Sequence, residues 1–432
     1  MNPQTLYDLS PLARMMAFGI VLAAVPLLWV AWRRRNGSST QRLHALTLVT
    51  LFLTFDLVLF GAFTRLTDSG LGCPDWPGCY GNASPLGAQA DIAVAQSAMP
   101  TGPVTRGKAW IEMVHRYLAT GVGVLILVLA VQNWLAPGRR LAVQPGNAAP
   151  GLAPSPASRL APTSPWLATA TLVWVCVQGA FGALTVTMKL FPAIVTLHLM
   201  GGLVLLALLT VQVVRQQQFR TGTTPVPVSP AVRTLVWATF ALLAVQIALG
   251  GWVSTNYAVL ACNEFPRCQN SWWPAMDFEQ GFQIWRKLGF TQQGDHINFA
   301  ALTAIHYVHR MMALVVLLAA ASLAWVLNGQ SHGSAASREN VAVNGLRTPA
   351  RWIAGLIGLQ LATGLSNVVL DWPLLAALLH TGGAGALVVV MTWVACASRA
   401  SQSNPSHPSR HAEGADPGAI PLRSMNAAGL NR

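Results

Sequence analysis

The chain has 432 residues, of which 53% are hydrophobic and only 9% are charged, and Lys and Arg outnumber Asp and Glu by 27 to 14. Soluble domains carry about 25% charged residues, so this composition excludes a water-soluble globule and a disordered chain. A basic chain can bind nucleic acid, but these cations lie between long apolar runs, as in integral membrane proteins. We therefore expect membrane lipid around the protein and no nucleic-acid partner.

Nine apolar segments are long enough to cross a bilayer as helices, which takes about 20 residues each. In chain order they are 12–32, 44–64, 110–134, 166–188, 192–214, 232–253, 299–327, 350–370 and 374–397. The first segment lacks the basic start and small-residue cleavage site of a signal peptide, and three arginines follow it as a stop-transfer flank. The pattern predicts an all-α integral membrane protein with nine spans.

The cations predict the orientation of these spans. Connections on one side hold 17 Lys and Arg, and those on the other side hold 8. The richer side faces the cytoplasm. We expect a multi-pass protein of the bacterial inner membrane, with a periplasmic N-terminus, a cytoplasmic C-terminus and long periplasmic loops at 65–109 and 254–298. The stretch 135–165 is rich in Pro, Ala, Gly and Ser, which predicts a flexible linker.

The two halves of the chain repeat the same landmarks in the same order: a cysteine pair, a histidine followed by arginine, a Gln-to-Gly segment and a later histidine. The matching residues are Cys73/Cys262, Cys79/Cys268, His115/His309, Gln178/Gln360, Gly182/Gly364 and His198/His380. Random apolar sequence would not give this series twice. Both halves begin on the same side of the membrane, so the repeat is parallel, unlike the inverted repeats of several transporters.

The repeat predicts two tandem, pseudo-symmetric four-helix bundles, at 44–214 and 232–397. A cytoplasmic linker, 215–231, joins them. Residues 1–43 add one extra N-terminal transmembrane helix and a basic loop, and 398–432 form a disordered cytoplasmic tail.

Four histidines inside the predicted spans occupy equivalent places in the two halves: His115 and His198, then His309 and His380. A single histidine in a span is most often a packing residue with a hydrogen-bond partner. Two imidazoles facing each other from the second and fourth helices of a bundle suit bis-His haem iron, in both halves. Zinc is the alternative, but a structural zinc site needs four close ligands, and each bundle offers two or three.

Glu112 lies three residues before His115, so both side chains point to a similar side of the helix. Two interpretations stay open: an ion pair with Arg116, or a proton acceptor or charge stabiliser beside a bound substrate. His306 occupies the matching position in the second half.

Three arginines lie near the outer membrane surface and are candidate contacts for haem propionates, because a guanidinium matches a carboxylate bidentately. They are Arg65, Arg116 and Arg310. Interfacial anchoring is the alternative role for all three.

The cysteine pairs Cys73–Cys79 and Cys262–Cys268 each close a short turn that contains proline, in a predicted periplasmic loop. An oxidising compartment allows disulfides, so we expect each pair to form one. A structural role in the loop and a redox role both stay open.

Five segments, spread over both predicted bundles, carry a family resemblance. They are GAFTRLTDSGLGCPDWPGC (61–79), EMVHR (112–116), TLHLMGG (196–202), HYVHR (306–310) and LLHTGGAG (378–385). As an ordered set they resemble the haem A synthase family, called cytochrome oxidase assembly protein 15 in mitochondria. The extra helix at 12–32 departs from the eight-helix plan of that family.

The resemblance implies an oxidoreductase that converts the C8 methyl group of haem O to the formyl group of haem A, for cytochrome c oxidase. It implies a b-type haem cofactor ligated by His309 and His380, and substrate haem between His115 and His198 with Glu112 beside it. It also implies haem O synthase and cytochrome oxidase assembly factors as partners. A non-catalytic di-haem b-type membrane electron carrier is the alternative, and a haem exporter is a third interpretation.

Overall fold

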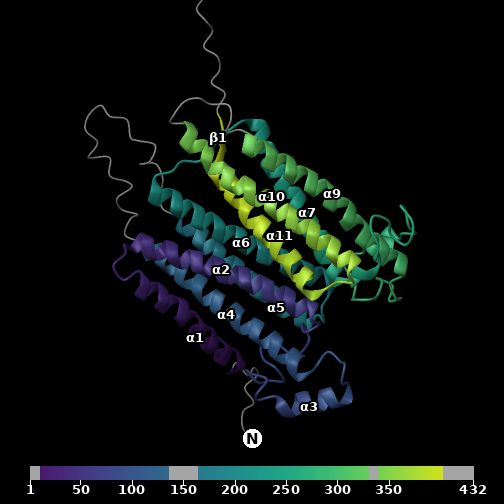
Figure 1. Cartoon of the computed structure of the whole chain (residues 1–432). Helices are drawn as coiled ribbons and strands as arrows, with labels where there is room; N and C mark the ends of the chain where they lie inside the picture. Colours follow the sequence, from purple (N-terminus) through teal and green to yellow (C-terminus); the bar gives the residue numbers. More distant parts are fainter. Residues whose placement is uncertain (1–9, 136–163, 330–338, 402–432) are drawn as a thin grey trace, which may run out of the picture. The chain divides into compact units, whose positions relative to one another are not determined.

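The computed structural model describes residues 10–135, 164–329 and 339–401 (Figure 1). Within these residues, nine helices are long and apolar enough to cross a membrane, and they confirm the nine predicted spans. They are α1 (Ser10–Arg33), α2 (Ser39–Leu66), α4 (Arg106–Leu135), α5 (Pro165–Thr187), α6 (Pro192–Thr221), α7 (Pro230–Thr255), α9 (Phe299–Gly329), α10 (Glu339–Val369) and α11 (Leu374–Ala397). Most of the predicted linker 135–165 and of the predicted tail lies outside the described residues.

The helices begin and end where local chemistry favours it. Ser38 caps α2, because its hydroxyl accepts from the N–H of Gln41 while the Gln41 side chain accepts from the N–H of Ser38. Proline opens α5, α6 and α7, where a missing N–H costs no helical bond. Gly222 ends α6 with a φ of 66°, the left-handed conformation that glycine adopts easily.

Two rings of four helices form the membrane part. The first bundle consists of α2, α4, α5 and α6, and the second consists of α7, α9, α10 and α11. The bundles meet along α6 and α11, with α7 also on α6 and α2 also on α11. Helix α1 packs against α4, where a Cβ added to Gly19 would lie 2.4 Å from Cγ2 of Thr120, so this contact requires a residue without a side chain.

The repeat extends to unusual backbone conformations. Non-glycine residues with positive φ occur at matching places in the two halves. The matching pairs are Asp68/Tyr257, Tyr80/Gln269, Lys189/Asp371 and Leu190/Trp372. The helix connections are therefore pseudo-symmetric in conformation, although their sequences differ.

Both long loops leave the helices at the same end, which we call the loop end (Figure 1). The first loop, 67–105, contains α3 (Gln89–Ala98). The second loop, 256–298, contains the 3₁₀ turn η4 (Ala258–Leu260) and α8 (Phe278–Gly281).

At the opposite end, β1 (Val226–Val228) pairs in parallel with β2 (Ser398–Ala400). The sequence analysis assigns these residues to the linker and to the disordered tail and predicts no strand, so the assignment of 398–400 is wrong. Helix α6 also continues to Thr221, past the predicted end at 214. Hydropathy predicts the lipid-crossing part of a helix, whereas the polar glutamines that follow remain good helix formers.

Candidate functional site

The first pair of imidazoles lies inside the first bundle, and each ring packs against a glycine. A Cβ added to Gly61 of α2 would lie 3.0 Å from Nε2 of His115 on α4. A Cβ added to Gly182 of α5 would lie 3.3 Å from Cε1 of His198 on α6. Glycine is therefore favoured at both positions, because the Cβ of any other residue would occupy the space next to the imidazole ring.

The second pair repeats this arrangement. A Cβ added to Gly250 of α7 would lie 2.9 Å from Cε1 of His309 on α9, and one added to Gly364 of α10 would lie 3.3 Å from Cε1 of His380 on α11. Gly61 opens the family segment 61–79, and the 189-residue offset that relates the cysteines also relates it to Gly250, a match not expected from the sequence.

A glutamine on the neighbouring helix donates to the backbone carbonyl of three of the four histidines. The pairs are Gln178–His198, Gln246–His309 and Gln360–His380. Each bond ties the turn that carries an imidazole to the helix that carries the facing glycine. The rotation of the three helices that carry these histidines is therefore fixed by side-chain contacts as well as by packing.

The Nδ1 atoms of the histidines have different surroundings. Nδ1 of His198 lies 3.1 Å from Nε2 of Gln178. Nδ1 of His380 lies 3.0 Å from the hydroxyl oxygen of Thr363. Nδ1 of His309 is buried and has no hydrogen-bond partner among the described residues. The equivalent imidazoles of His198 and His380 thus have different neighbours at Nδ1.

The donor set in each bundle fits haem iron. Haem iron takes its other four nitrogens from the porphyrin and needs only two axial imidazoles from the protein. Within the described ranges, no group of three or more His, Cys, Asp and Glu side chains could hold a metal ion by itself. A structural zinc site needs four protein ligands, so the paired imidazoles fit haem better than zinc.

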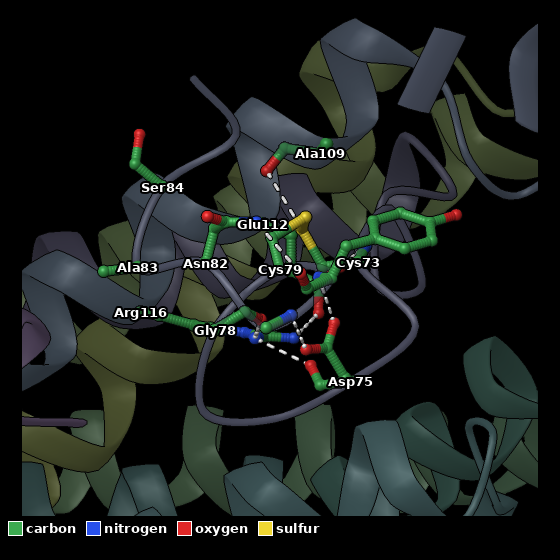
Figure 2. The surroundings of a disulfide bond; sticks show 12 residues. Cys73, Asp75, Gly78, Cys79, Asn82, Ala83, Ser84, Ala109, Glu112 and Arg116 are labelled. Carbon is green, nitrogen blue, oxygen red and sulfur yellow. Dashed lines mark hydrogen bonds and ion pairs between the residues drawn. A yellow bond between two sulfur atoms is a disulfide. The ribbon is translucent and has the colours of Figure 1, made fainter. Parts of the chain in front are cut away.

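Glu112 fastens the first loop to α4 (Figure 2). Its carboxylate is only 4% exposed; Oε2 accepts from the backbone N–H of Cys73 at 2.8 Å, and Oε1 accepts from Arg116. The predicted ion pair between Glu112 and Arg116 is confirmed. A carboxylate that holds a loop in this way can also act on a substrate.

His306 makes the matching contact in the second bundle. Its Nδ1 accepts from the backbone N–H of Cys262 at 3.3 Å, and its side chain is buried. Glu112 and His306 therefore occupy one structural position with different chemistry. At this position the first bundle has an acidic side chain, and the second has an imidazole.

Both cysteine pairs form disulfides, Cys73–Cys79 and Cys262–Cys268. A carboxylate inside each closed turn accepts from backbone N–H groups: Asp75 does so in the first loop (Figure 2) and Glu264 does so in the second. The two turns are thus built in the same way, with the disulfide at their base.

Arg116 and Arg310 point at these turns. Nη1 of Arg116 donates to the carbonyl oxygens of Asp75, Pro77 and Gly78, at 3.0, 3.1 and 2.6 Å (Figure 2). Arg310 donates to the carbonyls of the matching turn, at Pro266 and Arg267. The sequence analysis offers both arginines as propionate contacts; the structure directs their guanidinium groups to the loop backbone.

Arg65 lies where the two bundles meet at the loop end. It donates to the carbonyl of Ser254, pairs with Asp68 and lies 4.1 Å from the centre of the Tyr257 ring. The Tyr257 hydroxyl donates to Asp68. Burial raises the pKa of the Tyr257 phenol, and the positive charge of Arg65 offsets part of that rise. This contact joins equivalent corners of the two halves.

Known proteins match most of the chain. Residues 44–392 match the family COX15-CtaA, described as cytochrome oxidase assembly protein. The chain is 33% identical over 346 residues to a heme A synthase of Shewanella oneidensis, which covers 80% of this chain and 93% of that protein. It is 27% identical over 373 residues to a heme A synthase of Rhodospirillum centenum, covering 83% of this chain and 89% of that protein. A heme A synthase of Halalkalibacterium halodurans is 24% identical over 329 residues, or 75% of this chain and 86% of that protein. The family match contains the four paired imidazoles and both disulfides, whereas α1 precedes it.

Proposed function

The chain belongs to the COX15-CtaA family of cytochrome oxidase assembly proteins, and we propose on that basis that it is a haem A synthase. In this proposal it oxidises the C8 methyl group of haem O to the formyl group of haem A. The arrangement of two imidazole pairs, each between glycines in its own helix bundle, supports a protein that handles two haems.

We assign the substrate to the first bundle, between His115 and His198, and a haem b cofactor to the second, between His309 and His380. The observation that carries this assignment is the exchange of Glu112 for His306. Only the first bundle has a carboxylate on the ligand helix, one turn from an imidazole. A b-type haem in the second bundle would supply one-electron redox chemistry.

The reaction defines what Glu112 would do. Turning a methyl group into a formyl group with the oxygen of one water releases four protons, and four electrons that an external electron acceptor has to take up. The site therefore needs a proton acceptor or a group that stabilises positive charge. The Glu112 carboxylate is buried and held by Cys73 and Arg116. It is therefore positioned before substrate binds, which favours its acting on charge at the methyl carbon.

The propionates of a bound haem would lie toward the loop end in this proposal. Arg65 is one turn beyond Gly61 on α2 and keeps 17% of its side chain exposed. Arg116 and Arg310 would have to exchange loop carbonyls for propionates. We propose that the loop end faces the periplasm and the C-terminus faces the cytoplasm, which the distribution of cations and the disulfides support.

The alternative function is a di-haem b-type electron carrier. It would hold two permanent haems and convert neither. The difference between Glu112 and His306 favours the enzyme, because transfer of electrons alone does not require a carboxylate beside one haem.

Pigment analysis tests the proposal. The purified protein is extracted with acid solvent and its haems are separated, and the haems of cells that depend on it are analysed in the same way. Glu112→Ala should retain haem but leave haem O or a hydroxylated intermediate in place of haem A. His306→Ala is the matched control for loss of the loop contact. Normal haem A from Glu112→Ala would remove Glu112 from the reaction, and absence of haem A from wild-type cells would favour the electron carrier.

A further inference from the structure

The two imidazole pairs differ at one ring nitrogen. In the second bundle, Nδ1 of His380 lies 3.0 Å from the hydroxyl of Thr363 on α10. In the first bundle, Phe181 takes the position of Thr363, and Nδ1 of His198 lies 3.1 Å from the side-chain nitrogen of Gln178. The ligands are of the same type, but only one of them has a hydroxyl beside it.

The Thr363 hydroxyl can only accept a hydrogen bond from this imidazole. Its one hydrogen is already donated to the carbonyl of Leu359, four residues back, at 2.7 Å. A hydroxyl has a single hydrogen and two lone pairs, so its contact with Nδ1 uses a lone pair. The ring hydrogen of His380 is then on Nδ1. The free lone pair of the neutral imidazole is on Nε2, and a metal-binding histidine is fixed in this way when its other nitrogen donates.

Gln178 gives His198 a different neighbour. Its side-chain nitrogen donates to the carbonyl oxygen of His198 and lies 3.1 Å from Nδ1 of the ring. Phe181 carries no hydroxyl, so this ring lacks the acceptor that Thr363 offers to His380.

We propose that Thr363 is a positioning residue that presets His380 as a lasting axial ligand, so that the second bundle retains its haem while the first bundle exchanges its haem. The inference rests on the proposed function, in which haem O has to enter one bundle and haem A has to leave it. Retention and exchange are then decided by the residue beside the ligand, because the ligands themselves are the same.

The test removes the hydroxyl and measures how firmly haem b is held. Thr363→Val lacks the hydroxyl at nearly the same shape, and Thr363→Ser keeps it. Thr392→Val is the control, because the Thr392 hydroxyl makes the same type of bond to a carbonyl four residues back on α11, at 2.7 Å, twelve residues beyond His380. The readouts are the rate of haem transfer from the purified holoprotein to excess apomyoglobin, and the midpoint potential of the haem.

We expect Thr363→Val to release haem b roughly 10–100-fold faster than wild type, as is typical when the partner of a ligand is removed, and to shift the potential. Thr363→Ser and Thr392→Val should behave like wild type. A wild-type rate and potential in Thr363→Val would overturn the inference. Equal acceleration in Thr363→Ser and Thr363→Val would also overturn it, because packing alone would then explain the change.

Two further variants keep the outcomes distinct. If Thr363→Val does not fold, Thr363→Ala also removes the hydroxyl and can be compared with Thr363→Ser instead. His380→Ala tests the underlying proposal: it should lose haem b. Full retention of haem b in His380→Ala would contradict the proposed function itself, whereas loss of haem b there with no effect of Thr363→Val would contradict only the role of Thr363.

Discussion

The interiors of the two bundles differ most at the end away from the loops. There the first bundle buries polar side chains where the second buries aliphatic ones. The matching pairs are Thr47/Val236, Asn133/Leu327, Thr171/Ile353 and Gln212/Val394, all at most 6% exposed. The second bundle therefore has a continuous apolar core, and the first has polar groups that need partners.

At the loop end, by contrast, the two bundles have the same arrangement of functional side chains. Each has an imidazole pair between glycines, a disulfide turn, an arginine that donates to that turn and a side chain that accepts from the first cysteine. The two halves therefore share the residues that position the imidazoles and the disulfide turns. At this end the bundles diverge at two matching positions near the imidazoles in the sequence or the fold: Glu112 against His306, and Phe181 against Thr363.

Removing one imidazole from each bundle gives the largest expected difference. His309→Ala should abolish binding of haem b, because one axial ligand remains in an apolar core, whereas His115→Ala should leave haem b bound and abolish haem A formation. The haem content per protein, measured as the pyridine haemochrome, checks this. His44→Ala is the control, since His44 is buried but at the far end of α2. Equal loss of haem b from both variants would contradict the division of roles.

Truncating the arginine of each turn should separate the bundles in stability. Arg116→Ala leaves the buried Glu112 carboxylate without its cation, which costs about 3–5 kcal/mol in the free energy of unfolding. Arg310→Ala removes hydrogen bonds of a half-buried arginine that forms no salt bridge with any described residue, at about 1 kcal/mol. Reversible unfolding in detergent measures both values. Similar losses would show that the Glu112–Arg116 pair adds nothing special to the first bundle.

Adding one methyl group beside each imidazole should have a smaller effect. Gly61→Ala and Gly250→Ala place a Cβ within 3.0 Å of an imidazole, and overpacking of this kind costs about 1–3 kcal/mol. We expect Gly250→Ala to weaken retention of haem b and Gly61→Ala to raise the KM for haem O. Gly179→Ala and Gly358→Ala are matched controls, because a Cβ there meets nothing within 4 Å. Wild-type behaviour of Gly61→Ala and Gly250→Ala would mean that the helices shift without cost.

The smallest expected effect compares the two loops. Asp277 caps α8 by accepting from the N–H of Gln280, at 2.9 Å, whereas α3 begins without a side-chain cap. That backbone N–H and then the Asn298 side chain lower the pKa of Asp277 from its usual 3.8. A carboxyl with a lowered pKa contributes stability above pH 3.8, and the contribution is lost as the pH falls below that value.

Asp277→Ala should therefore speed hydrogen exchange of the α8 amides at pH 7, and the acceleration should be smaller near pH 3. The α3 amides serve as the internal control at each pH. An effect of equal size at both values would mean that the ionised carboxylate is not what holds the cap.

Much of the site could be predicted from the sequence, because it rests on repeated residues of distinctive chemistry. Hydropathy predicts the spans, and the offsets between cysteines and histidines predict which residues correspond. The family match supports the same range. What pairs with what across a bundle could not be predicted in this way. Thr363 is 17 residues from His380, and their contact depends on how α10 and α11 are rotated.

Two other features, the contacts of the arginines and the pairing of β1 with β2, could not be predicted from the sequence, for different physical reasons. Arginines beside a predicted haem site look like propionate ligands, and only coordinates reveal that Arg116 and Arg310 face loop carbonyls. Strands β1 and β2 have three residues each, which is too few for an alternating hydrophobic pattern to be recognised in the sequence. Its strands also come from segments whose composition resembles a linker and a tail.

The two bundles are fastened to each other at both ends of their helices. At the loop end Arg65 reaches Ser254, and Thr196 lies 3.2 Å from Thr255. At the other end Gln218 donates to the carbonyl of Cys396, beside the strand ladder. The two bundles cannot separate without breaking hydrogen bonds at both ends of their helices. A haem is therefore expected to enter from the lipid, between two neighbouring helices of one bundle.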